Sequence, residues 1–287
     1  MKRLLTLSLS ALLLVSATGC EDARAKLNTS NEVVFTIGTQ SFTKGQLYTM
    51  LNNANNVDVV INESLRKICA SEIETTDEMR KNAESIVESY KTMYGDYFLQ
   101  SIKASGMSEE DYIENIILSE QQTSLVEKYI DENYERIASE NTPVKASVLI
   151  YATEENADKA LSALKDGSKS VEEVATEFES SSQGQSEIIT LNSSYYPAEI
   201  SAYIRSGSMD DGWQKILGST DGRYYVVHID ETDVNKIKDE VIEILSTNTT
   251  ITDDAFRHYF NKYNFHIYDK DLYDAINNAS PHLIVQN

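Results

Sequence analysis

Cysteine and histidine, the residue types best suited to chemistry, are few and widely spaced in this chain of 287 residues. Both residue types bind metals when they are separated by short, characteristic spacings in the sequence. No two cysteines or histidines of this chain have such a spacing. No glycine-rich phosphate-binding loop occurs, and no Ser/His/Asp order or carboxylate pair stands out among 46 acidic residues. The sequence therefore predicts no metal, no cofactor and no hydrolase site. The residues concerned are Cys20, Cys69, His228, His258, His266 and His282.

Cys20 directly follows a short apolar segment at the N-terminus. Residues 2–3 are basic, residues 4–15 are mostly apolar and residues 17–19 are small or polar. A basic start, an apolar stretch too short to span a bilayer and a cleavage site are typical of a signal peptide. This ending resembles the lipobox of bacterial lipoproteins. The resemblance implies cleavage after residue 19 and acyl chains such as palmitate on Cys20. Ordinary secretion with a cysteine near the cut is the alternative.

Such a lipoprotein would be held on the extracytoplasmic face of the cell membrane. Acyl chains anchor a protein durably when two or more are attached, and residues 20–31 would form a polar tether. Without residues 1–19, 23 basic residues remain against 46 acidic ones. This negative field repels phosphate backbones, which argues against nucleic acid as a partner. It would also attract cationic segments of other proteins, and the alternative is that it serves solubility alone. Once Cys20 is acylated, Cys69 is the last thiol, and a buried structural role is expected for it.

Helical periodicity dominates the first part of the chain. A strand is predicted over residues 32–37 and a helix start near Thr43. Apolar residues recur at helix spacing from about residue 76 to 137. Gly106 interrupts this pattern, and Ser108 restarts it with a capping hydroxyl followed by acidic residues.

Pro143 marks a boundary, because proline disfavours continuation of a helix. Beyond it, strands are predicted over residues 145–151, 187–191 and 223–229, with two helices in between. The helix starts are Thr153 and the capping box at Ser170. From residue 234 the pattern is helical again, with further starts predicted at Thr252 and Asp269. A small α/β domain between helical segments is therefore expected.

Several of these segments resemble known proteins. Residues 145–150 (KASVLI) and 171–175 (VEEVA) resemble the opening of parvulin-type peptidyl-prolyl isomerases, and residues 224–227 (YYVV) resemble the closing strand. Residues 262–265 (KYNF) and 269–272 (DKDL) are similar to the C-terminus of PrsA-type foldases. Helix starts at residues 41–44 and 106–110 resemble N-terminal parts of the same family. The order of the parts, more than any single motif, carries the resemblance.

The resemblance implies an α+β fold with an inserted domain. A mainly helical chaperone domain would combine an N-terminal part, residues 32–141, with a C-terminal part, residues 233–287. A small parvulin-like α/β domain would occupy residues 142–232. PrsA-type lipoproteins assist the folding of exported proteins beyond the membrane, so the implied partners are unfolded or newly exported polypeptides. Pairing of two chains into a homodimer stays open.

The catalytic residues of the family are not intact in this sequence. Parvulins hold two histidines against a central Asp or Cys, and these positions align with Ser147, Tyr225 and Ser181. The X–Pro barrier is about 20 kcal/mol, and lowering it requires preorganised polar groups. His228 lies three positions past the expected place, and strand alternation points it away from the face of Tyr225. The family is enzymatic, but isomerase activity is expected to be weak or lost.

Aromatic residues supply the candidates for peptide binding. They lie in the connection where parvulins build the wall that faces proline, and aromatic side chains offer large contact at low entropic cost. The alternative is that they form the core of the small domain. Two other functions stay open: an active isomerase with an atypical site, and a surface scaffold that uses the acidic face for one fixed partner. The candidates are Tyr195, Tyr196, Tyr203 and Trp213.

Overall fold

The computed structural model describes residues 28–37, 40–46, 48, 56–191, 193 and 195–286. Cys20 and the predicted signal peptide lie outside these residues. The chain divides into two compact units, of which the second runs from Val126 to Thr252 and the first contains the remainder. Among the described helices, none combines the length and apolar character needed to cross a membrane.

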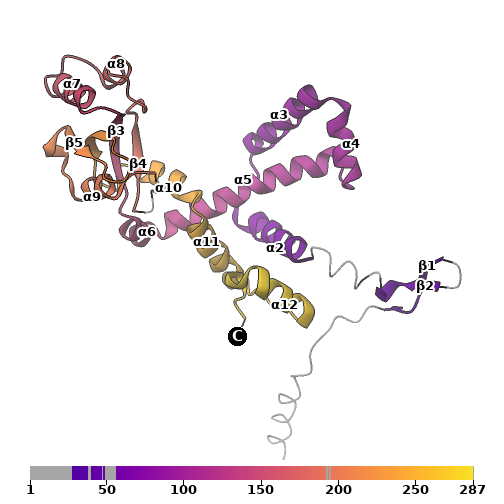
Figure 1. Ribbon diagram of the computed structural model, residues 1–287. Helices are drawn as coiled ribbons and strands as arrows, with labels where there is room; N and C mark the ends of the chain where they lie inside the picture. Colours follow the sequence, from indigo (N-terminus) through magenta and orange to yellow (C-terminus); the bar gives the residue numbers. More distant parts are fainter. Residues whose placement is uncertain are drawn as a thin grey trace, which may run out of the picture. The chain divides into compact units, whose positions relative to one another are not determined.

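The first unit is helical apart from one hairpin (Figure 1). Strands β1 and β2 pair antiparallel, and the helices from α2 onward form the rest. Helices α5 and α11 each continue from one unit into the other. The elements are β1 Val33–Ile37, β2 Gln40–Thr43, α2 Asn56–Glu72, α3 Asp77–Tyr94, α4 Asp96–Ala104, α5 Glu109–Glu132, α11 Thr249–Lys262, α12 Lys270–Ala279 and η2 Pro281–Leu283.

Side-chain caps decide where several of these helices begin. Thr76 accepts a hydrogen bond from the backbone N–H of Met79 at the start of α3. At the start of α5, Ser108 and Asp111 exchange side-chain to backbone hydrogen bonds. Gly95, with φ of 54°, separates α3 from α4 in a conformation that favours glycine. The sequence predicted the start at residue 108 from its capping hydroxyl and the start near residue 76 from apolar periodicity.

Segments from the two ends of the sequence meet in the first unit. Lys262, at the end of α11, forms an ion pair with Glu72 at the end of α2. The Tyr263 hydroxyl donates to Glu72 Oε1 at 2.8 Å, and α12 packs against α2. Cys69 of α2 is fully buried, as expected of a structural cysteine.

The second unit contains a four-stranded antiparallel sheet with helices on both faces (Figure 1). The strand order is β4-β3-β6-β5, so the first and last long strands, β3 and β6, pair at the centre. The elements are α6 Tyr134–Asn141, β3 Val144–Tyr151, α7 Glu154–Lys165, α8 Val171–Glu177, β4 Ser186–Ile189, α9 Ala198–Ser206, η1 Met209–Asp211, β5 Gln214–Leu217, β6 Tyr224–Glu231 and α10 Lys238–Ser246.

The two faces of this sheet belong to two separate cores, because successive side chains of a strand point to opposite faces. On one face, Val148 and Tyr225 pack with Ile200 and Ile204 of α9. We call this the α9 face. On the other face, residues such as Leu149 pack against the alanine-rich side of α7 and against α8. We call this the α7 face.

The predicted α+β fold is confirmed: the chain is mainly helical and carries a small domain built on a four-stranded antiparallel sheet. The capping box of α8 forms between Ser170 and Glu173 as predicted. Helix α9 and strand β5 were missed, and the predicted strands at residues 187–191 and 223–229 are displaced by one or two residues. The helical pattern predicted up to residue 137 is divided between α5, which ends at Glu132, and α6. The domain boundaries at residues 142 and 232 stay predictions.

One predicted helix start was wrong by three residues. The sequence indicated Thr252, whereas α11 begins at Thr249. The reason is a competing cap: the side chain of Asn248 accepts hydrogen bonds from the backbone N–H groups of Thr250 and Ile251, at 3.0 and 3.3 Å. Asparagine ranks at least as high as threonine at this position.

Cys69 should be protected until the protein unfolds. Burial raises the pKa of its thiol to about 11, so the neutral thiol predominates at neutral pH. In a Cys20→Ser variant we expect Cys69 to react with a maleimide at least ~100-fold more slowly in buffer than in denaturant. The ordinary pKa of 9.0 applies to the unfolded chain, so ionisation favours unfolding and stability falls as pH rises from 9 to 11. Equal rates in both conditions would contradict the burial.

Candidate functional site

The three family positions lie in different surroundings. Ser147 is buried on β3, and its hydroxyl donates to Asp230 Oδ2 at 2.8 Å. Tyr225 is buried on β6, and its phenol donates to Asp221 Oδ2 at 2.6 Å. Ser181 is exposed after α8, and its backbone N–H donates to the carbonyl of Ile150 at 2.8 Å. Each of the three already has a structural partner.

Ser147 and Tyr225 are on opposite faces of the sheet. Tyr225 belongs to the core of the α9 face, together with Val148. Ser147, one residue earlier on β3, points to the α7 face with Leu149. Two groups acting on one peptide bond must share a face, so the constellation drawn from the alignment does not form. An alignment shifted by one residue brings Val148, an apolar side chain, next to Tyr225.

Ser147 is instead part of a polar cluster around Asp230. Oδ1 of Asp230 lies 2.7 Å from Nδ1 of His228, and Oδ2 accepts from the hydroxyls of Ser147 and Ser186. Ser147 and His228 are direct register partners on β3 and β6. His228 therefore points away from Tyr225, as strand alternation predicted. Asp230 was missed, although its spacing of two residues from His228 places it on the same face.

The ring of Trp213 lies 5.1 Å from the ring of His228, on the α7 face. Tyr196 and Tyr203, by contrast, pack on the core of the α9 face, and Tyr195 is exposed. The four predicted peptide-binding residues therefore do not form one surface. Three of them are close to the α9 face, and their role in binding stays a prediction.

A tyrosine-centred wall is the best candidate site in the second unit. Ile150, Tyr225 and Ile216 stand in register across β3, β6 and β5. Tyr196 covers this row, with its ring 6.3 Å from that of Tyr225 and edge-on to it. The ring of Tyr195 lies 5.3 Å from the ring of Tyr196. We call these five residues the tyrosine wall. It is apolar, partly exposed and rimmed by two carboxylates, Glu187 and Asp221.

Both central phenols of the wall are held neutral. Burial, and then the hydrogen bond to Asp221, raises the pKa of Tyr225 to about 12. Burial also raises the pKa of Tyr196, with a further contribution from its hydrogen bond to Glu187. Each hydroxyl proton is already donated to a carboxylate. The wall can therefore contact apolar groups, but its two phenols have no proton left to donate to a substrate carbonyl.

The loop between α8 and β4 is short and tightly packed. Gly184 has φ of 65°, and a Cβ there would lie 2.6 Å from Cδ2 of Leu149. The Ser182 hydroxyl donates to the carbonyl of Val148 at 2.7 Å. Contacts of this kind occupy the hydroxyls of residues 180–182 and the backbone N–H of Ser181. Within the described ranges, no group of three or more His, Cys, Asp or Glu residues could hold a metal ion.

The chain is thus an α+β protein whose second unit has an apolar, tyrosine-lined face. Two relatives found by sequence are foldases. Two proteins called foldase protein PrsA, from two strains of Clostridium perfringens, are 24% and 23% identical to this chain over 143 residues. The match covers 45% of this chain and 42% of each relative, so it spans well under half the length of the curated proteins. The chain is thus similar in sequence to PrsA-type foldases, as its motifs indicated.

Solved structures that match this chain include PrsA proteins. The foldase protein PrsA of Streptococcus pneumoniae is 17% identical, with 85% of this chain and 98% of that one covered at a TM-score of 0.46. The peptidylprolyl isomerase PrsA of Bacillus cereus is 14% identical, with 88% and 99% covered at a TM-score of 0.47. No family model matches the chain.

The separation of Ser147 from Tyr225 can be tested by additivity. Ser147→Ala and Tyr225→Phe each remove one hydrogen bond to a carboxylate, and each should lower the free energy of unfolding by about 1–2 kcal/mol. Because the two side chains share no partner, the double variant should be additive within about 0.5 kcal/mol in denaturant titrations.

The matched control is the pair Ser147→Ala and Asp230→Ala, which remove the same hydrogen bond from both sides. This pair should be non-additive by more than about 0.5 kcal/mol. Coupling between Ser147 and Tyr225 of that size would show that they act in one site after all.

Proposed function

We propose that this chain is a lipid-anchored extracytoplasmic foldase that assists the folding of exported proteins as a chaperone, with prolyl isomerase activity weak or lost. Its clients would be unfolded or newly exported polypeptides. The sequence similarity to foldases called PrsA supports the first part. The tyrosine wall carries the second part.

Isomerisation of an X–Pro bond requires stabilisation of a twisted amide that has lost its conjugation. Tyr225 stands at the family position of a histidine, and its proton is committed to Asp221 at 2.6 Å. Val148, beside it on the same face, offers no polar atom. The polar cluster around Asp230 lies on the α7 face, away from the wall. The wall is thus suited to hold an apolar segment and poorly suited to lower the barrier.

Binding without turnover fits the charge of the protein. An excess of acidic residues keeps the body soluble and attracts cationic segments of clients at long range. A chaperone of this kind requires contact area and solubility, and neither ATP nor a metal takes part.

The absence of strong isomerase activity should be visible in two assays run side by side. With a short X–Pro peptide, the full chain is expected to give the uncatalysed exchange rate, because both central phenols of the wall already donate to carboxylates. With a chemically denatured model protein, it should reduce light scattering on dilution at about equimolar amounts. Clear acceleration of exchange would overturn the proposed loss of activity. Normal aggregation of the client would overturn the chaperone itself.

Anchoring through Cys20 makes a separate prediction. In bacteria expressing the chain with Cys20→Ser, the protein should move from the membrane fraction to the soluble fraction, because the acyl chains supply the durable attachment. An alkyne-tagged fatty acid should label the original chain and leave the variant unlabelled. Cys69→Ser is the control and should change neither result, since that thiol is buried. Membrane association that survives Cys20→Ser would contradict the lipid anchor.

A further inference from the structure

The end of the α3–α4 hairpin exposes an unusual number of large apolar side chains. Met93 is 68% exposed, Tyr94 53% and Tyr97 74%, and Ile86 is also exposed. Single exposed apolar residues are ordinary on protein surfaces, whereas a contiguous group marks an interaction site. One side of α3 carries four residues at helix spacing, namely Ile86, Tyr90, Met93 and Tyr94. We call these four residues and Tyr97 the arm surface.

A packed aromatic cluster supports the arm surface from below. The ring of Tyr90 lies 6.2 Å from that of Tyr94, 5.6 Å from that of Phe98 and 6.4 Å from that of Tyr112. Phe98 and Tyr112 meet edge to face at 5.2 Å. Beneath them lies a buried core contributed by α3, α4 and α5. The exposed side chains therefore stand on a rigid base.

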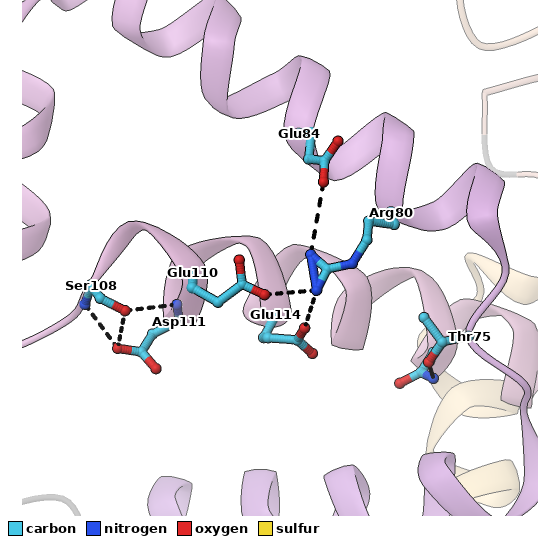
Figure 2. A network of polar contacts seen from close by, with 8 residues as sticks. Thr75, Arg80, Glu84, Ser108, Glu110, Asp111 and Glu114 are labelled. Atoms are coloured by element: carbon cyan, nitrogen blue, oxygen red, sulfur yellow. Dashed lines mark hydrogen bonds and ion pairs between the residues drawn. The ribbon is translucent and has the colours of Figure 1, made fainter.

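Ion pairs hold α3 against α5, and the side chains that form them do not belong to the arm surface. Figure 2 shows Arg80 of α3 between Glu110 and Glu114 of α5, at 2.7 and 3.1 Å, with Glu84 at 3.8 Å. Lys91 pairs with Glu109 of α5 at 2.5 Å. Together with the buried core, these contacts position the two helices. The hairpin does not depend on Met93 or Tyr97 for its packing, so these side chains are available to a partner.

The charge of the hairpin indicates which partner fits. Residues 77–115 contain nine acidic and four basic residues. The ion pairs just described hold two of the bases and four of the acids, so an excess of acidic residues is left. A second copy of the same surface, or an anionic membrane, would meet a like charge. A partner that carries apolar side chains together with Lys or Arg meets both an apolar surface and an opposite charge.

We propose that the arm surface binds unfolded polypeptide segments that combine apolar side chains with lysine or arginine. Methionine adapts to differently shaped partners, and tyrosine offers large contact area at low entropic cost. Such a surface accepts many sequences. The proposal rests on the proposed chaperone function and adds a location and a substrate class to it.

A peptide-binding experiment on the full chain tests the proposal. The probe is a fluorescent 15-residue peptide of leucine, phenylalanine and lysine, and the readout is its anisotropy. Met93→Ser/Tyr97→Ser should weaken binding at least about tenfold, since two apolar contacts are lost. The matched control is Val59→Ser/Tyr268→Ser, which removes two side chains that are 62% and 77% exposed in the same unit. This control should leave the affinity unchanged.

Two further peptides separate charge from apolar contact. Replacing every lysine by glutamate should weaken binding at least about tenfold, and replacing the apolar residues by serine should weaken it by a similar factor. A photo-crosslinking residue at position 97, in an otherwise unchanged chain, should capture the original peptide. This measurement does not depend on the folding of the double variant.

Equal affinity of Met93→Ser/Tyr97→Ser and the original chain, with no crosslink from position 97, would overturn the proposal. So would sedimentation showing that the arm surface joins two copies of the chain and that the peptide does not compete. If the original chain suppresses client aggregation and the double variant does so equally well, the inference fails and the proposed function stands. If the original chain binds no peptide and suppresses no aggregation, both fail.

Discussion

The pairing of β3 with β6, and the alternation of their side chains, is the constraint on which the second unit depends. Every residue of these strands must face either the core with α9 or the core with α7 and α8. The core with α9 contains Tyr225, Val227 and Ile229 of β6. His228 and Asp230 therefore face the side of α7 and α8. The polar cluster around Asp230 is thereby placed on one face, and on the other face the two central phenols of the tyrosine wall are bonded to carboxylates. The chemistry of the domain follows from this division.

Much of the fold was predictable because its signals are local. Capping residues such as Thr76 and Ser170 satisfy backbone N–H groups within one turn, and their sequence pattern is sufficient to locate a helix start. The short strand β5 and helix α9 were missed for the opposite reason. Their burial patterns depend on the sheet beneath them, and residues 193–217 are rich in polar and aromatic residues that give no clear period.

The site was less predictable than the fold, since one residue of alignment decides the face. Ser147 and Val148 are neighbours in sequence, yet they belong to different cores, and only the register with β6 distinguishes them. No propensity or motif contains that information. The partner of Ser147, Asp230, lies 83 residues away along the chain. The arm surface was hidden in the same way, because a stripe such as Ile86, Tyr90 and Met93 is most often core, and exposure cannot be read from spacing.

The contact between Glu72 and the pair Lys262 and Tyr263 joins residues about 190 positions apart. Helix α2 therefore has to wait for the last part of the chain before this contact can form. In a polypeptide that is delivered N-terminus first, residues 126–252 are complete while the first unit is still missing its closing helices. Contacts distant in sequence form slowly, and the apolar sides of α2 stay uncovered in the meantime. The first unit thus closes only with segments from both ends of the sequence, so a chain that lacks its last helices would leave part of α2 without its packing partner.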